Sequence, residues 1–230
     1  MKILITSGGT SEKIDRVRSI TNHSTGRLGA TLAHYFAEKG DEVTLVTTEK
    51  AVKPAAKPNL TITLVETVNS LLETLEPLVK THDVLIHAMA VSDYTPVYMA
   101  DFDQVAQVEN LQVFLEQENS ESKISSHSDY QVLFLKKTPK IIRHIKLWNP
   151  KITLIGFKLL VDVPQKELLD VASQSLETNQ ADMIVANDLT EITKHHHRAY
   201  LVETEKVTSV ETKEEIAHQL YTYLHRKDER

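Results

Sequence analysis

Apolar residues in this chain form short continuous runs that alternate with segments of helical spacing. The runs predict strands at 2–6, 43–47, 60–65, 82–91, 152–157 and 182–186, with edge strands at 199–203 and 206–209. Helices are predicted from Gly26 to Gly40 and at 67–80, 139–147, 164–179 and 212–226. Strands that are apolar on consecutive positions are typical of a parallel sheet covered on both faces. The order therefore predicts an α/β fold with a Rossmann-like, doubly wound, mostly parallel sheet.

Two segments depart from this pattern. Ser11–Thr25 is polar and has no clear period, so we expect a long loop there. The segment 93–135 is irregular, holds short strand candidates at 123–125 and 131–135, and is interpreted as a flap. Because no low-complexity linker or break in composition divides the chain, residues 1–230 are expected to form a single domain.

The composition narrows the classes of function. The 26 basic and 32 acidic side chains give a net charge of −6, whereas sequence-independent nucleic-acid binding needs clustered positive charge. The absence of cysteine excludes disulfides, a thiolate metal site and a cysteine nucleophile. No stretch approaches the ~20 apolar residues that span a bilayer, and the first residues turn polar too early for a secretory signal. We expect a cytoplasmic protein that binds small molecules.

Two glycine-rich groups flank the first predicted helix. Gly8 and Gly9 follow the first strand, and Ser24, Gly26 and Gly29 lie at the start of the helix. In an open α/β sheet the ligand crevice lies at the carboxyl ends of the strands. A glycine turn and a helix N-terminus there offer free N–H groups to phosphate. The alternative is that the glycines only make a tight turn, and the compact G-x-G-x-x-G fingerprint of dinucleotide sites is absent.

The polar loop between these glycine groups carries two candidate ligand-binding residues. Arg18 can pair with a carboxylate or phosphate. Asn22 can both donate and accept hydrogen bonds, and so could hold a reactive acyl group. The alternative is an ordinary solvated loop in which Asn22 caps the helix.

Further candidates follow later strands. Small residues before Asp93 would let a ligand approach the backbone, and Asp93 could bind a hydroxyl or a metal, or simply cap a turn. Lys123 and Lys140 could neutralise phosphate charge, although a lone lysine more often lies on a solvated face. Pro139 suits the first turn of a helix capped by Thr138.

Two later predicted strands end in glycine or polar residues, and we expect both ends at the same edge of the sheet as the glycine turn. Gly156-Phe157-Lys158 ends one predicted strand and Ala186-Asn187-Asp188 ends the next. Phe157 could flank a base or an apolar arm of a ligand, although such a residue is more often part of the core. The three histidines at 195–197 are interpreted as a surface loop, because adjacent residues of a strand alternate faces and cannot all chelate one ion.

Together these segments resemble the phosphopantothenate–cysteine ligase family. ITSGGTSEKIDRVRSITNHSTGRLG is similar to its signature, and AMAVSDY, KIS, KTPKII, IGFK and DMIVANDLT resemble its later motifs in the same order. The resemblance runs from about residue 3 to 190. Bacterial members are often fused to a flavin-dependent decarboxylase, which this sequence lacks, so a stand-alone bacterial ligase is expected.

The resemblance implies a reaction and a set of site residues. The family joins 4′-phosphopantothenate to L-cysteine in coenzyme A biosynthesis, through an acyl-nucleotidylate formed from a nucleoside triphosphate, usually CTP, with Mg²⁺. It implies a homodimer with contacts near 95–135. Catalytic roles fall on Asn22, Arg18 and Lys123, the last in the flap. The predicted nucleotide-binding residues are Gly8, Gly9, Ser24, Gly26, Gly29, Met89, Ala90, Asp93, Pro139, Lys140, Ile141, Ile142, Phe157, Lys158 and Asn187.

The sequence also departs from the family pattern. Ser175 and Asn179 stand where many bacterial members carry lysines that contact the triphosphate, and IGFKL is closer to the eukaryotic, ATP-using version. Lys158 is a hypothetical replacement for the missing charge. We still expect CTP, because Ala186-Asn187-Asp188 and the short length are similar to bacterial members, with ATP as the alternative. A nicotinamide-dependent reductase and a non-catalytic nucleotide sensor are the alternatives from other classes.

Overall fold

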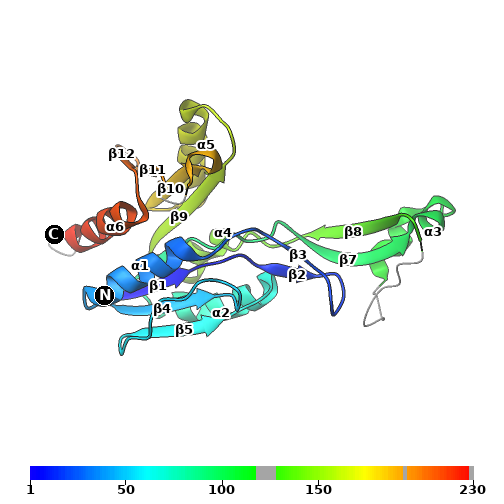
Figure 1. Ribbon diagram of the computed structural model, residues 1–230, viewed down its shortest axis with the longest axis horizontal. Coiled ribbons are helices and arrows are strands. Elements are labelled where there is room, and N and C mark those ends of the chain that lie inside the picture. The colour runs from blue at the N-terminus through cyan, green and yellow to red at the C-terminus, as the bar shows by residue number, and fades with distance from the viewer. Residues whose placement is uncertain (118–127, 194–195, 228–230) are drawn as a thin grey trace.

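An eight-stranded sheet forms the centre of the protein, which the computed structural model describes over residues 1–117, 128–193 and 196–227 (Figure 1). The strand order is β12-β11-β10-β9-β6-β1-β4-β5. The bounds are β1 Lys2–Thr6, β4 Glu42–Thr47, β5 Leu60–Leu64, β6 Val84–His87, β9 Thr153–Leu160, β10 Met183–Asp188, β11 Ala199–Val202 and β12 Val207–Val210. All pairings from β5 to β10 are parallel, and β11 and β12 are antiparallel additions. The predicted α/β class is confirmed.

Helices cover both faces of this sheet. The helices α1 (Arg27–Glu38) and α6 (Lys213–Lys227) pack on one face, and α2 (Val68–Val79), α4 (Ile142–Trp148) and α5 (Gln165–Thr178) on the other. Within β1, Ile3 and Ile5 face α1 and α6, whereas Leu4 faces α2 and α4. Each strand therefore buries apolar side chains in both directions, which explains why its apolar residues are consecutive.

The direction of winding reverses between β1 and β6. The chain runs from β1 outward to β4 and β5, then returns to place β6 on the other side of β1 and continues outward to β9 and β10. Loops at the carboxyl ends of these two neighbouring strands leave in opposite directions, which opens a crevice where ligands bind in such folds. The predicted glycine turn follows β1 at this point.

The described residues of the segment predicted as a flap form an arm that extends away from the sheet (Figure 1). The strands β7 (Tyr94–Asp101) and β8 (Gln131–Lys137) pair antiparallel in a separate two-stranded sheet. At the outer end lies α3 (Phe102–Ala106), whereas the 3₁₀ turn at Leu111–Glu116 stacks Phe114 on Tyr98 of β7 and Phe134 of β8. The strand candidate at 131–135 is confirmed within β8, while the candidate at 123–125 lies outside the described residues.

The loop expected over Ser11–Thr25 contains a hairpin, so that prediction was wrong in part. Ser11–Lys13 (β2) pairs antiparallel with Ser19–Thr21 (β3). Three-residue strands are too short to show a period of two, and their fixed position comes from tertiary contacts. Glu12 is buried, and its Oε1 accepts a hydrogen bond from the Val68 backbone N–H at 2.7 Å, at the start of α2.

Some predicted boundaries also shift. The strand expected at 82–91 is paired as a ladder only over β6, after which the chain stays extended and is linked to β1 by a bridge between Gly9 and Ala90. Phe157 and Lys158 lie inside β9 rather than at its end, because β9 continues to pair with β10 up to Leu160. Beside β6, however, pairing stops at Gly156, so the last residues of β9 extend past the end of that neighbour.

Candidate functional site

The two glycine groups predicted from the sequence meet at the end of β1. Ser7 Oγ donates a hydrogen bond to the Gly26 carbonyl at 3.0 Å, and a Cβ at Gly29 would overlap the Ser7 side chain. A Cβ at Gly8 would lie 2.9 Å from the Ala51 methyl carbon, and a Cβ at Gly26 2.8 Å from the same atom. The glycines at Gly26 and Gly29 therefore let α1 dock directly on the strand end, a packing role that the spacing did not reveal.

Gly9 brings a third segment to the same point. A Cβ there would overlap the Asn22 carbonyl oxygen. The Ala90 N–H donates to the Gly8 carbonyl at 2.9 Å, and the Thr10 N–H donates to the Ala90 carbonyl at 3.0 Å. The Asn22 N–H in turn donates to the Thr10 carbonyl at 3.4 Å. The turn after β1, the chain after β6 and the end of the hairpin thus converge at the topological switch point.

The N-terminus of α1 at this convergence has no cap from its N-cap residue, although Thr25 Oγ1 accepts a hydrogen bond from the Arg27 N–H at 3.4 Å. The N-cap residue is Gly26, which offers no side-chain acceptor, and the first turn holds no acidic residue. Ser24 is half-buried just before it, and Arg27 is exposed at the first helical position. Backbone N–H groups and the helix dipole at such an end favour an anion. The arrangement suits a phosphate group.

Threonine side chains hold the segment that follows β6. Thr10 Oγ1 accepts from the Ser92 N–H at 2.9 Å, and Thr138 Oγ1 donates to the Ser92 carbonyl at 2.5 Å. The Thr138 N–H donates to the Asp93 carbonyl at 2.9 Å. Thr138 therefore ties the end of β8 to this segment, and the prediction that it caps a helix was wrong. Ser92 was not singled out from the sequence, and its buried Oγ has no hydrogen-bond partner within the described residues.

Asp93 and Lys140, both predicted to contact nucleotide, form an ion pair with each other. Their side chains are 62% and 44% exposed, so water screens the pair and a charged ligand can compete for either partner. Pro139 lies outside α4, which begins only at Ile142, so its predicted place in the first helical turn was wrong. Ile142 Cδ1 would lie 3.0 Å from a Cβ at Gly156, which explains the glycine in β9.

The remaining predicted nucleotide contacts are distributed over the core and β9–β10. Met89 and Ile141 have buried side chains that pack with α2 and α4. Phe157 is half-buried against the α1–α6 face, whereas Lys158 follows it in the strand and points to the opposite face. Asn187 is buried, with Nδ2 3.4 Å from Nε2 of His197. Contacts of these residues with a nucleotide stay predictions.

Of the three predicted catalytic residues, two are described. Asn22 is half-buried at the convergence, and its side chain makes no hydrogen bond within the described part of the chain. Arg18 lies at the turn of the hairpin, bound to Asp15, a residue to which the sequence assigned no role. The signal available for Asp15 was its spacing of three residues from Arg18. Lys123 lies outside the described residues.

A neutral histidine lies beneath the site at the end of β6. His87 Nδ1 is 2.8 Å from Thr6 Oγ1, and Thr6 Oγ1 in turn accepts from the Met89 N–H at 3.2 Å. Burial lowers the pKa of His87 to about 4, because the charged imidazolium would lose its hydration. His197 has a pKa lowered to about 4 mainly by burial and then by the charge of Lys213.

Unfolding should become easier as the pH falls from neutrality toward pH 4. His87 takes up a proton near its pKa of 6.5 when the chain is unfolded but only near 4 when folded, so the unfolded state binds more protons within that window. We expect His87 alone to remove about 2 kcal/mol from the free energy of unfolding between pH 7 and pH 5. Urea titrations at both values measure the loss, and His87→Gln should reduce it; an unchanged difference in the variant would contradict this assignment.

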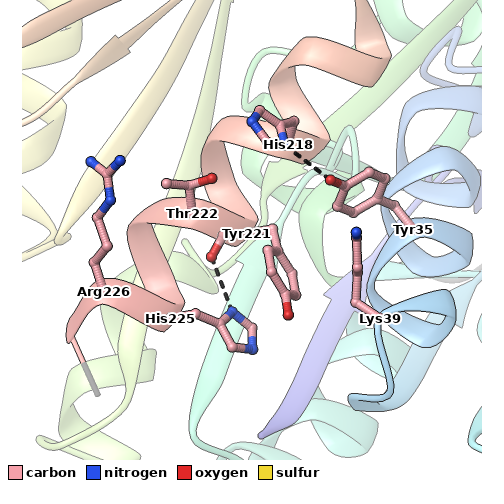
Figure 2. Close-up of a pocket in the computed structure, with 7 residues that line it drawn as sticks. All are labelled: Tyr35, Lys39, His218, Tyr221, Thr222, His225 and Arg226. Carbon is pink, nitrogen blue, oxygen red and sulfur yellow. Dashed lines mark hydrogen bonds between the residues drawn. The ribbon is translucent and has the colours of Figure 1, made fainter. Parts of the chain in front are cut away.

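A hollow of about 250 Å³ lies between α1 and α6, away from this convergence (Figure 2). Tyr35, Lys39 and Tyr221 line it, with the Lys39 ammonium 5.7 Å from the Tyr35 ring centroid and 5.9 Å from that of Tyr221. Lys39 caps the C-terminus of α1, and Arg226, also in the lining, lies in the last turn of α6. Cations at these positions complement the helix dipoles, which accounts for the positive charge.

The described residues contain neither a cluster of metal-ligating side chains nor a membrane-spanning helix. No group of three or more His, Cys, Asp or Glu side chains there could hold a metal ion together. No helix in the described part of the chain has the length and apolar character needed to cross a bilayer.

The chain is similar to proteins whose names are known. The family model of the DNA/pantothenate metabolism flavoprotein C-terminal domain matches residues 1–117 and 108–227. The coenzyme A biosynthesis bifunctional protein CoaBC of Thermococcus kodakarensis is 32% identical over 224 residues, covering 96% of this chain and 50% of that protein. The chain thus spans about half the length of such curated relatives.

Two solved structures are also similar. The DNA/pantothenate metabolism flavoprotein from Streptococcus pneumoniae is 54% identical, with a TM-score of 0.95 over 99% of both chains. The C-terminal domain of coenzyme A biosynthesis bifunctional protein CoaBC is 27% identical, with a TM-score of 0.74 over 99% of this chain and 95% of that chain. Both confirm the doubly wound fold.

Proposed function

Because this chain belongs to the DNA/pantothenate metabolism flavoprotein C-terminal domain family, as the motifs predicted, we propose that it is the ligase that joins 4′-phosphopantothenate to L-cysteine in coenzyme A biosynthesis. One observation carries the proposal. The N-terminus of α1, which begins at a glycine N-cap, converges with the glycine turn and Asn22 at the switch point of the sheet. This is where an α/β fold binds a nucleotide, and the arrangement provides donors for phosphate beside a polar side chain for an acyl group.

The proposed reaction has two half-reactions. First, a carboxylate oxygen of 4′-phosphopantothenate attacks the α-phosphorus of CTP, and the bond to pyrophosphate breaks to leave an acyl-cytidylate. The amine nitrogen of cysteine then attacks the acyl carbon, CMP leaves, and the amine loses a proton. Asn22 orients the acyl-cytidylate, and Arg18 donates hydrogen bonds to an anionic oxygen of the acid. Positioning and charge stabilisation are the main requirements of such chemistry.

Magnesium enters this proposal with the triphosphate. Mg²⁺ is usually held by one or two carboxylates together with substrate phosphates rather than by a cage of side chains. Asp93 fits this description, because it is an exposed carboxylate next to the switch point, and Lys140 beside it can donate hydrogen bonds to phosphate oxygens. When bound, the ion would neutralise charge on the triphosphate.

The choice of triphosphate is tested with one assay. The protein is mixed with 4′-phosphopantothenate, cysteine and either CTP or ATP, and release of pyrophosphate is followed together with amide formation. We expect both products with CTP and a lower rate with ATP; a clear ATP preference would overturn the choice of CTP. Pyrophosphate without amide would favour the nucleotide sensor, and tight binding of NADPH in a fluorescence titration would favour the reductase.

We also propose that two copies associate through the arm. The arm exposes the large apolar side chains of Tyr94, Phe102, Leu111, Val113, Leu115, Tyr130 and Leu135. Because monomers rarely expose large apolar patches, we expect a second copy to cover these side chains. Light scattering should give the mass of a dimer, and Tyr130→Asp, at a side chain 73% exposed, should shift it toward the monomer. Leu147→Glu, at a 77% exposed side chain on α4, is the matched control and should leave the dimer intact. A monomeric wild type would contradict the proposal.

A further inference from the structure

The hairpin between β1 and α1 contains a carboxylate that has no exposed surface. The side chain of Asp15 is 0% exposed, and it lies in the turn that joins β2 to β3. Burial of a carboxylate is costly unless every oxygen is paired. The structure meets this condition, because both oxygens of Asp15 accept hydrogen bonds from the turn itself.

The two oxygens of Asp15 serve different partners. Oδ1 accepts from the backbone N–H groups of Val17 at 2.8 Å and Arg18 at 2.7 Å, which shapes the turn. Oδ2 accepts from Arg18 Nε at 2.9 Å and Nη2 at 2.7 Å, a two-point contact with one edge of the guanidinium. Such a contact fixes the plane of the guanidinium as well as its position. A side chain with a single acceptor oxygen could keep the backbone contacts of Oδ1, but it would lose the contacts of Oδ2 with the guanidinium.

The hairpin that carries this pair is itself held at its base. The Glu12 carboxylate binds the start of α2, and the Ser11 N–H donates to the Glu66 carbonyl at 2.8 Å. β2 contacts β7, and the hairpin projects from the sheet alongside the start of the arm (Figure 1). A guanidinium fixed on an anchored hairpin is already oriented before a substrate arrives, and this lowers the entropic cost of binding.

We propose that Asp15 is a positioning residue, which orients the guanidinium of Arg18 toward an anionic oxygen of the acid substrate. This inference rests on the proposed function, in which Arg18 contacts that substrate. The Asp15–Arg18 pair has no net charge, so Arg18 acts on the substrate through directed N–H groups rather than through uncompensated positive charge. Asp15 takes two of the five N–H donors that an arginine side chain carries.

The substitution Asp15→Asn separates the two tasks of this side chain. Asparagine keeps one oxygen for the backbone N–H groups of the turn, but it presents an N–H donor where Oδ2 accepted from Arg18. We expect kcat/KM for 4′-phosphopantothenate to fall about tenfold to hundredfold, the equivalent of losing a hydrogen bond to a charged group. The KM for the triphosphate should change little, because its binding site at the glycine turn is untouched.

Arg18→Gln and the double variant show whether Asp15 acts through Arg18. If it does, adding Asp15→Asn to Arg18→Gln lowers kcat/KM no further. Glu12→Gln is the matched control, because it neutralises the other buried carboxylate of the hairpin while keeping an acceptor for Val68, and it should retain wild-type kcat/KM. Thermal melting of all variants identifies those that fail to fold.

Each outcome bears on a different statement. A wild type that forms no amide contradicts the proposed function. If the wild type forms amide, two results contradict the positioning role. One is an Asp15→Asn variant that is as active as the wild type, and the other is additive effects of Asp15→Asn and Arg18→Gln. An equal loss in Glu12→Gln also contradicts it, since the effect would then belong to the hairpin as a whole. Non-additive losses with a normal control support it.

Discussion

Asn22→Ala should lower amide formation by about 100- to 1000-fold while part of the pyrophosphate exchange with CTP survives. The side chain is half-buried at the convergence of three segments and makes no hydrogen bond to any described residue, so its amide group is available to a ligand. The phosphate donors at the glycine turn and the start of α1 do not depend on it. Loss of one donor that stabilises a reacting acyl group typically lowers a rate about 100- to 1000-fold.

The measurement compares two readouts in one variant. Exchange of labelled pyrophosphate into CTP reports the first half-reaction, and chromatography of the amide product reports the second. Asn69→Ala is the control, because Asn69 is an exposed residue of α2 whose side chain donates to Glu73 at 3.0 Å, and it should behave as wild type. Unchanged amide formation in Asn22→Ala would remove Asn22 from the reaction.

Gly9→Ala should impair both half-reactions. A Cβ at this position would overlap the backbone carbonyl oxygen of Asn22, and a backbone atom cannot rotate away as a flexible side chain can. The turn after β1, or the residues that lead into α1, must therefore shift. Displacement of a reacting group by about 1 Å can lower a rate about 100-fold. We expect such a loss in kcat/KM for both pyrophosphate release and amide formation.

Gly40→Ala separates this effect from a general loss of stability. Gly40 has a φ of +95°, so alanine there is strained, yet its Cβ would meet no atom within 4 Å. It lies after α1, next to the start of β4 and far along the chain from the glycine turn. We expect a destabilisation of about 1–2 kcal/mol, seen as a lower melting temperature, with retained kcat/KM. A Gly9→Ala variant that keeps wild-type rates would refute the placement of the site.

Much of the fold could be predicted from the spacing of apolar residues, because the sheet is mostly parallel and covered on both faces. Residues such as Ile3, Leu4 and Ile5 must all be apolar when consecutive side chains point into two different cores. Helices such as α1 and α5 are long enough to show their spacing and were predicted within a few residues. The β2–β3 hairpin was missed because its strands have three residues each and their pairing depends on distant contacts such as Glu12 with Val68.

The sequence by itself determined the doubly wound class, the family and the residues that could bind an anion, since these follow from apolar runs, glycines and motif order that are local in the chain. Only the tertiary structure decided what those residues touch. It showed that Gly26 and Gly29 accommodate Ser7 and Ala51, that Thr138 binds the chain after β6, and that Arg18 is bound to a buried Asp15. Contacts of this kind depend on how closely segments far apart in the chain approach one another in the fold, and the spacing of residues along the sequence does not predict that approach.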